Sequence, residues 1–188
     1  MKRIFTFCLA LMTLATVSAA DNIPAKIKAF HKANEKFECA FTEVCVTAKT
    51  NKKENREGKL VFQAPDDLRM DYSQPAGDYV LINKDKMAQS KKGKEQSVKV
   101  KNKDNRYATY RATLLSCLGG DVEKAAQLND AQAVCTQSGN TYLCTITAEK
   151  ASNKEIKELK LEYDAATGQI ISMTITQGNG NYSTYTIK

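Results

Sequence analysis

Apolar and polar residues alternate in short runs along most of this chain, and the runs end at proline, glycine or asparagine. The stretch 59-KLVFQAPDDLRMDYSQPAGDYVLIN-83 shows the pattern twice, with a stop at each proline, before it becomes continuously apolar. A period of two is typical of strands that bury one face, and proline is tolerated in the turns between them. We therefore predict about eleven strands, at residues 37–46, 59–63, 68–72, 79–83, 86–90, 96–101, 131–137, 141–148, 156–164, 169–176 and 182–187. Residues 50–58 are predicted to form a polar loop.

A helical period precedes the first strand. Residues 21–37 carry large apolar side chains at roughly helical spacing, namely Ile23, Ile27, Phe30 and Phe37. Asp21 is the expected N-cap, and Pro24 lies in the first turn, where a helix tolerates proline. His31, the only histidine of the chain, lies beside the apolar stripe. We interpret it as a partly solvated helix residue.

A second helix is predicted in the middle of the chain. The segment 107-YATYRATLLSCLGG-120 places Leu114, Leu115 and Leu118 on one side and ends at two glycines, which commonly stop a helix. Residues 121–129 are predicted to add a second, shorter helical piece. The strands before and after this region would then be separated by a helical segment.

The predicted strands share one apolar face. Its alternating residues are Leu60, Phe62, Leu68, Met70, Tyr72, Leu159, Leu161, Tyr163, Met173 and Ile175. About eleven strands are too many for a stable flat sheet in a chain of this size, so we expect a barrel or a half-closed barrel. Two interpretations of the apolar face remain open. The helices fill it as an ordinary core, or they cover it incompletely and leave a pocket for an acyl chain.

The first twenty residues, MKRIFTFCLALMTLATVSAA, are typical of a secretory signal peptide, with a basic start, an apolar middle and small residues at the end. We expect cleavage before Asp21, so that residues 21–188 form a single soluble, exported domain. The chain has 28 basic and 21 acidic residues, a net charge of +7, which falls to +5 when Lys2 and Arg3 are removed. No later segment reaches the ~20 apolar residues of a membrane helix.

Five cysteines follow the signal peptide: Cys39, Cys45, Cys117, Cys135 and Cys144. The odd number leaves at least one thiol free unless two chains are linked. The spacings lack the paired CxxC of a zinc ribbon or a redox site, and with one histidine we expect no metal and no cofactor. The connectivity of Cys39, Cys45 and Cys117 stays open, except that Cys39 and Cys45 are too far apart on a straight strand to be bridged.

The hairpin around Gly139 and Asn140 brings two of the cysteines together. If these residues form a two-residue loop, Ser138 pairs with Thr141, and counting outward places Cys135 opposite Cys144. The pair falls at a non-hydrogen-bonded position, where side chains approach most closely. We therefore predict either a Cys135–Cys144 disulfide or two small apolar strand residues.

Catalytic motifs are absent from the sequence: it has no GxSxG elbow, HExxH pair, Walker loop or dinucleotide fingerprint. We therefore expect a protein that is not an enzyme. The run Lys84 to Lys103 contains eight lysines against Asp85 and Glu95. It is interpreted as a solvated sheet edge, or as a contact for anionic lipid head groups or an acidic protein. Nucleic acid is not expected, because arginine is nearly absent from the run and no aromatic residues are interleaved.

Several segments together resemble one known family. They are an FxxxFTE segment at residues 37–43, 58-GKLVFQAPDDLRMDYSQPAGDYVLIN-83, a central helix and a final 178-GNGNYSTYTI-187. This order is similar to that of the periplasmic lipoprotein carrier LolA and its relatives. The amino-acid sequences of the segments at residues 68–83 and 178–187 resemble those of the LolA-like proteins of the Bacteroidetes. The family commonly has an arginine before Pro65 that holds its lid closed, and an aromatic residue at the position of Met70. This chain has Ala64 and Met70 there.

The resemblance implies an α+β fold, an incomplete antiparallel barrel whose helices form a lid over a hydrophobic cavity. The residues expected to line the cavity are Leu60, Phe62, Leu68, Met70, Tyr72, Val80, Ile82, Leu115, Leu161, Tyr163, Met173 and Ile175. The residues expected on the lid helices are Ile27, Phe30, Leu114 and Leu118.

The function implied by the resemblance is that of a monomeric periplasmic chaperone. It would take acylated lipoproteins from an inner-membrane lipoprotein-releasing transporter to an outer-membrane acceptor. Two alternatives remain open: a sensor or interaction domain of the same fold that detects mislocalised lipoproteins, and a carrier of a different acyl lipid.

Overall fold

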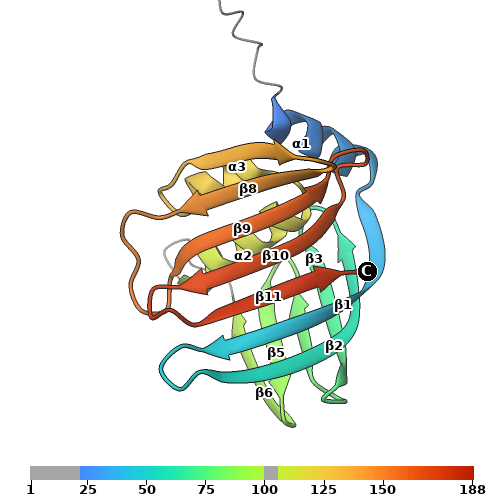
Figure 1. The fold of residues 1–188 in the computed structure, drawn as a ribbon. Coiled ribbons are helices and arrows are strands. Elements are labelled where there is room, and N and C mark those ends of the chain that lie inside the picture. Colours follow the sequence, from blue (N-terminus) through green and yellow to red (C-terminus); the bar gives the residue numbers. More distant parts are fainter. Residues whose placement is uncertain (1–21, 100–105) are drawn as a thin grey trace, which may run out of the picture.

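The computed structural model describes residues 22–99 and 106–188, which form one open antiparallel sheet of eleven strands and three helices (Figure 1). The strand order is β6-β5-β4-β3-β2-β1-β11-β10-β9-β8-β7. The strands are β1 (Lys36–Thr47), β2 (Lys52–Gln63), β3 (Asp67–Gln74), β4 (Tyr79–Ile82), β5 (Lys86–Lys91), β6 (Lys94–Lys99), β7 (Ala133–Ser138), β8 (Thr141–Thr147), β9 (Ile156–Asp164), β10 (Ile170–Gln177) and β11 (Tyr182–Ile187). The predicted fold class, an incomplete antiparallel barrel, is confirmed.

The two halves of the sheet meet where the first strand pairs with the last. β1 and β11 run antiparallel, from Phe41 opposite Ile187 to Val46 opposite Tyr182. All other neighbours in the sheet are consecutive in the chain, as expected for strands joined by short turns. β6 and β7 lie at the two ends of the strand order, so the barrel is not closed.

The prediction of a polar loop at residues 50–58 was wrong, because β2 begins at Lys52. Its full length pairs with β1, from Lys52 opposite Thr47 to Gln63 opposite Lys36. The polar character of residues 52–58 reflects a strand whose inward side chains are charged. Glu54 and Arg56, two residues apart on one face, form an ion pair of 3.1 Å there.

The sheet bends at Gly58. A Cβ on this residue would collide with the backbone carbonyl oxygen of Asp71 on β3, so only glycine fits. The register between β2 and β3 also shifts between Glu57 and Gly58. Such irregularities increase the local twist of a strand, and this one helps the first half of the sheet to curl.

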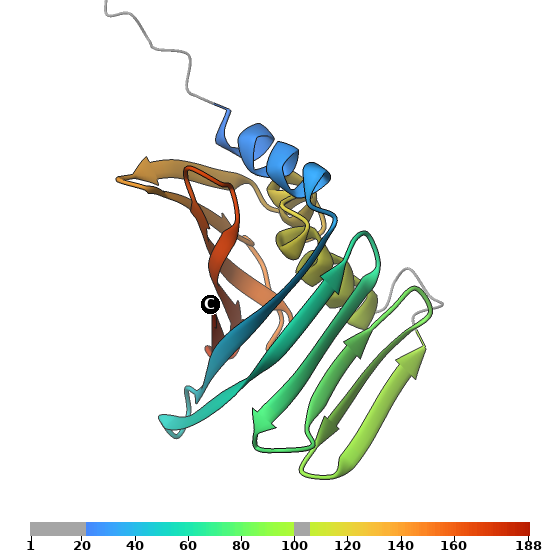
Figure 2. The ribbon, with the colours of Figure 1, turned by 90° about the vertical axis from the view of Figure 1, so that its right-hand side faces the viewer.

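The helices α2 (Arg106–Leu118) and α3 (Val122–Gln127) lie on the concave side of the sheet, between its two halves, and α1 (Ile23–Ala33) lies across one end (Figure 2). Leu114, Leu118 and Val122 are buried in the same hydrophobic cluster as the inward residues of the strands. The alternating apolar face predicted from the sequence is therefore covered by helices. None of the helices in the described ranges has the length and apolar character needed to cross a membrane.

The N-terminal helix differs in detail from its prediction. Asn22 is the N-cap, and its side chain accepts a hydrogen bond of 3.2 Å from the backbone N–H of Ala25. Asp21, the expected cap, lies outside the described residues together with the predicted signal peptide, residues 1–20. The helix ends at Ala33 and not near Phe37, because the chain pairs with β2 from Lys36 onward.

His31 is buried, with 4% of its surface exposed, so its interpretation as a partly solvated residue was wrong. Its ring packs against those of Phe30, Phe37 and Tyr163, with centroids 5.2, 6.4 and 6.1 Å away. Gly120, after α2, lies so close to this ring that a Cβ there would overlap it. The second glycine of the predicted helix stop therefore also makes room for α1.

Candidate ligand-binding cavity

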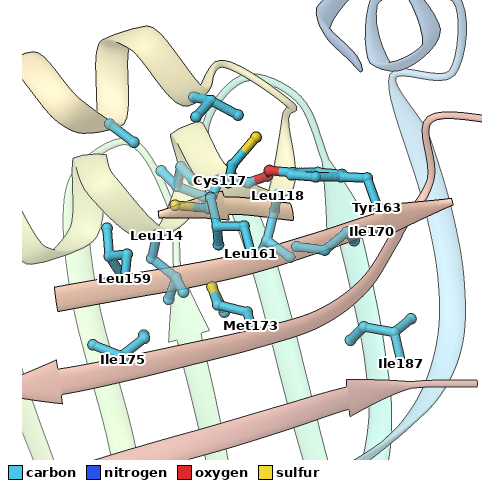
Figure 3. Packing of buried hydrophobic residues seen from close by; sticks show 14 of the residues in the cluster. Leu114, Cys117, Leu118, Leu159, Leu161, Tyr163, Ile170, Met173, Ile175 and Ile187 are labelled. Atoms are coloured by element: carbon cyan, nitrogen blue, oxygen red, sulfur yellow. The ribbon is translucent and has the colours of Figure 1, made fainter. Parts of the chain in front are cut away.

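The residues predicted for the cavity and its lid are brought together in space. With the exception of Phe30, all of them belong to one hydrophobic cluster or pack against it. Phe30 is half-buried and contacts the edge of the His31 ring. Figure 3 shows Leu114 and Leu118 of α2 directed at Leu161 and Met173 on the sheet.

A cavity of about 480 Å³ is lined by α2, by strands of the first half of the sheet and by residues of the second half such as Tyr185. Met70, Tyr72 and Val80 are the predicted cavity residues that line it, and Leu114 of the lid does so too. Phe62 and Leu115 line a smaller hollow of about 240 Å³, and Ile175 lines one of about 330 Å³. The remaining predicted residues, Leu60, Leu68, Ile82, Leu161, Tyr163 and Met173, are packed in the cluster.

The base of the 480 Å³ cavity is charged, although the surrounding face is apolar. Glu43, 4% exposed, is paired on the sheet with Arg56 of β2 on one side and Tyr185 of β11 on the other. Its carboxylate accepts a hydrogen bond of 2.7 Å from the Tyr72 hydroxyl, and Arg56 Nη1 lies 4.0 Å away. The Arg56 guanidinium also lies over the Tyr72 ring, 5.5 Å from its centroid. All four side chains line the cavity.

Three of the four tyrosines that line the cavity have raised pKa values and stay protonated at neutral pH. Burial, with a smaller contribution from the Glu43 carboxylate, raises the pKa of Tyr72 far above its usual range and the pKa of Tyr110 to about 12. Burial also raises the pKa of Tyr185. These hydroxyls are therefore neutral hydrogen-bond donors, and the charges at the base of the cavity belong to Glu43 and Arg56.

Two polar contacts fasten α2 over the sheet. At the C-terminal end of the helix, the Tyr163 hydroxyl of β9 donates a hydrogen bond of 3.0 Å to the Cys117 carbonyl (Figure 3). In the middle of the helix, Arg111 donates a hydrogen bond of 2.9 Å to the Asn83 carbonyl and one of 3.1 Å to the Asp66 carboxylate. Asp66 lies two residues after Ala64, where the resemblance led us to expect an arginine. In this chain the arginine comes from the helix and its acceptors come from the turns of the sheet.

The other end of the cover is formed by α1. Ile27 is fully buried, and Lys28 forms an ion pair of 2.9 Å with Asp121, the N-cap of α3. Burial lowers the pKa of His31, and a contact with the backbone of Gly168 opposes part of this shift. The packing of this ring is otherwise apolar and depends on a neutral imidazole.

The cysteines form one disulfide among the described residues, between Cys135 and Cys144, which are directly opposite each other on β7 and β8 with Cα atoms 4.1 Å apart. Cys39, Cys45 and Cys117 are free. Burial raises the pKa of Cys39 and Cys45 to about 11 and that of Cys117 to about 12. Thiols of such pKa are poor nucleophiles at neutral pH.

Metal ligands do not gather in this part of the chain: within residues 22–99 and 106–188, His, Cys, Asp and Glu form no group that could hold a metal ion. The lysine-rich run occupies β5, β6 and their turn up to Lys99, and the rest of it lies outside the described residues. Lys91 and Lys92, in and beside that turn, line the 330 Å³ hollow next to the main cavity.

Sequence reasoning missed Arg56 and Arg111. Counting back by twos from Phe62 and Leu60 places Gly58 and Arg56 on the inward face, so the strand period could have found Arg56. Its partner Glu43 falls on the same face of β1 as Phe41 by the strand period, but the period alone does not predict that a charge there is buried. Arg111 gives no comparable signal, since its acceptors lie in turns distant in sequence.

Comparisons with known proteins give a family and weak structural likenesses. The family model described as outer membrane lipoprotein carrier protein LolA matches residues 32–188. A search of curated proteins by sequence finds no match. Among solved structures, a LolA superfamily protein from Nitrosomonas europaea is similar, with a TM-score of 0.41 and 8% identity over 90% of this chain and 91% of that one. A domain from Vibrio parahaemolyticus, titled a putative outer membrane lipoprotein-sorting protein, has a TM-score of 0.44 and 8% identity over 88% of each chain.

Proposed function

The chain belongs to the LolA family of outer membrane lipoprotein carriers, and on that basis we propose that it is a periplasmic chaperone that carries acylated lipoproteins from the inner to the outer membrane. Residues 1–20 direct its export and are cleaved near Ala20. The acyl chains of the cargo bind on the concave face of the sheet, beneath α2.

The observation that supports this proposal is a partly filled concave face. An ordinary core is packed to high density with few voids larger than a water molecule. Here a cavity of about 480 Å³ that opens to solvent lies beside α2, and its apolar part is formed by Met70, Val80, Met87 and Leu114. Ligand cavities commonly measure roughly 300 to 1,000 Å³. Two methionines in the lining suit an acyl chain, because their flexible side chains adapt to irregular partners.

Release requires that the carrier not bind its cargo too well. Burial of each methylene is worth ~0.8 kcal/mol, so several long chains would bind too tightly to leave. Because α2 is fastened by Arg111 and Tyr163, cargo must displace these contacts and the packing of Leu114 before a whole chain enters. The cost of this opening offsets part of the gain from burial, and binding and opening form one coupled equilibrium.

The partners follow from this role. A monomeric carrier receives the acylated cargo from an inner-membrane lipoprotein-releasing transporter and delivers it to an outer-membrane acceptor.

Mass spectrometry of organic extracts from natively purified protein tests the proposal. We expect acylated peptides of lipoproteins in the extract, and release of a lipoprotein from inner-membrane vesicles when purified carrier is added. Recovery of another acyl lipid alone would identify a carrier of different cargo. Recovery of no acyl species, with no uptake of added acyl chains, would contradict both carrier functions and leave the sensor or interaction domain.

A further inference from the structure

The charged base of the cavity is unexpected for a site that holds only hydrocarbon. Taking an ion pair out of water costs several kcal/mol per ion, and apolar residues of similar volume are often equally or more stabilising. Arg56 has 9% of its side chain exposed, and Glu43 has 4%. Both face the same cavity as Met70 and Leu114. A cavity for acyl chains alone would gain nothing from this pair.

At the base of the cavity the Glu43 carboxylate is engaged, whereas one donor of Arg56 is not. The two oxygens of Glu43 already accept from the Cys45 thiol at 3.1 Å and from the Tyr72 hydroxyl at 2.7 Å. Arg56 Nη2 donates a hydrogen bond to the Glu54 carboxylate. The buried Nε of Arg56 has no hydrogen-bond partner among the described residues. A polar ligand that completes such a site is one that brings oxygen acceptors.

The charged side chains around the cavity also favour a ligand that brings oxygen acceptors. Lys154 lines its rim. The adjoining 330 Å³ hollow shares Tyr110 with the cavity and is lined by Lys52, Lys91 and Lys92. The two hollows together are lined by five cationic side chains and by two carboxylates, Glu43 and Glu54. An anionic ligand is therefore attracted to this end of the molecule.

We infer that the cavity binds a single-chain amphiphile with an anionic head group, with the head at Arg56 and Lys154 and the chain against Met70, Met87 and Leu114. The shared chemistry is a carboxylate or phosphate at the end of one acyl or alkyl chain. The size of the cavity agrees with one chain in the closed state, before α2 moves. This inference rests on the acyl-binding cavity of the proposed function and adds a second class of ligand, because the acyl chains of a lipoprotein are held as esters and an amide and carry no anionic head group.

Calorimetric titration with matched ligands tests the head group. Decanoate and decyl phosphate differ in their anion, decanol has the same chain without charge, and acetate and inorganic phosphate have no chain. We expect the two anionic amphiphiles to bind ten- to roughly a hundred-fold more tightly than decanol, the range of a charge-assisted hydrogen bond. Acetate and phosphate should not bind measurably.

Variants of the two cations test the position of the head. Lys154→Met, at the exposed rim, should reduce the preference for decanoate over decanol, while Lys160→Met, on the outer face of β9, should leave it unchanged. Arg56→Met alone would leave the buried Glu43 carboxylate without its neighbouring cation. It is therefore combined with Glu43→Gln in a double variant that removes both charges. In this variant decanoate and decanol should bind with similar affinity. Circular dichroism confirms that each variant is folded.

Three outcomes would overturn the inference. Equal binding of decanoate and decanol to the parent protein would remove the role of the head group and leave the proposed function intact. Survival of the preference in the double variant would show that the head does not lie at Arg56. Binding of inorganic phosphate as tight as that of decyl phosphate would remove the role of the chain. Failure of every amphiphile to bind the parent would instead remove the proposed function together with this inference.

Discussion

Replacing Arg111 should loosen the cover of the cavity without damaging the site beneath it. Arg111 joins α2 to two turns of the sheet, at Asn83 and at Asp66. Its side chain is 12% exposed, and that of Asp66 is 42% exposed. Arg111→Met removes both contacts and keeps the length of the aliphatic stem.

The magnitude follows from the two contacts. A hydrogen bond from a charged donor contributes about 1.5 to 3 kcal/mol. The half-exposed ion pair with Asp66 adds at most about 1 kcal/mol. In the open state Arg111 forms hydrogen bonds with water, which offsets part of the stabilisation that its two contacts give to the closed state. We therefore expect the free energy of opening α2 to fall by about 2 kcal/mol in the variant. Since 1.4 kcal/mol corresponds to a factor of ten, the open population and the rate of cargo uptake should rise roughly 30-fold.

Two measurements on the same variant separate the steps. Hydrogen exchange reports the opening of α2, and stopped-flow fluorescence with a fluorescent fatty acid reports uptake. Arg69→Met is the matched control, because Arg69 pairs with Asp71 on the outer face and is 54% exposed. Faster exchange in α2 without faster uptake would refute the reasoning, since it would mean that the chain enters without movement of this helix. Unchanged exchange would show that Arg111 does not hold the helix.

Three further predictions concern the lining, the N-terminal helix and the disulfide. Met70→Glu should keep a cooperative thermal melt and lose uptake of the fluorescent fatty acid, because Met70, although only 4% exposed, borders the open cavity. Leu161→Glu, in the packed cluster, should unfold the protein, and equal unfolding of both variants would make Met70 a core residue. Because burial lowers the pKa of His31 below its usual 6.5, its contribution to stability should be complete above pH 6.5 and decrease as pH falls through the lowered pKa. Chemical denaturation at pH 7 and 5 should show a loss that His31→Leu lacks, and an equal loss in both proteins would contradict this. Replacing Cys135 and Cys144 with serine should lower the free energy of unfolding by about 2 to 3 kcal/mol, as measured in urea, and an unchanged value would mean that the disulfide does not restrict the unfolded chain.

The order of elements could be predicted from the sequence because each strand carries its own local signal. The alternation through residues 59–83 and the prolines between its runs determine which side chains face inward, and the hairpin at Gly139 places Cys135 opposite Cys144. These features depend on neighbours in the chain. They need no knowledge of the tertiary structure.

The pairing of charges at the base of the cavity could not be predicted in the same way, although the strand period places Arg56 on the inward face. Residues 52–58 look like a loop because strand preference is weak in a run of Lys, Glu, Asn and Arg. Only pairing with β1 shows that Arg56 lies beside Glu43. The burial of His31 depends likewise on Tyr163 and Gly120, which are distant in sequence. Long-range pairing therefore decides which polar residues are buried.

Photo-crosslinking tests most directly the central claim that the space beneath α2 holds an acyl chain. A fatty acid with a diazirine near the end of its chain is bound to the protein, and the complex is irradiated. The labelled peptides are then identified by mass spectrometry. The account predicts labels on the peptides that contain Met70, Val80 or Leu114, and competition by unlabelled fatty acid. Labels on outward-facing residues such as Arg69 or Lys160, or labelling that the competitor does not reduce, would contradict it.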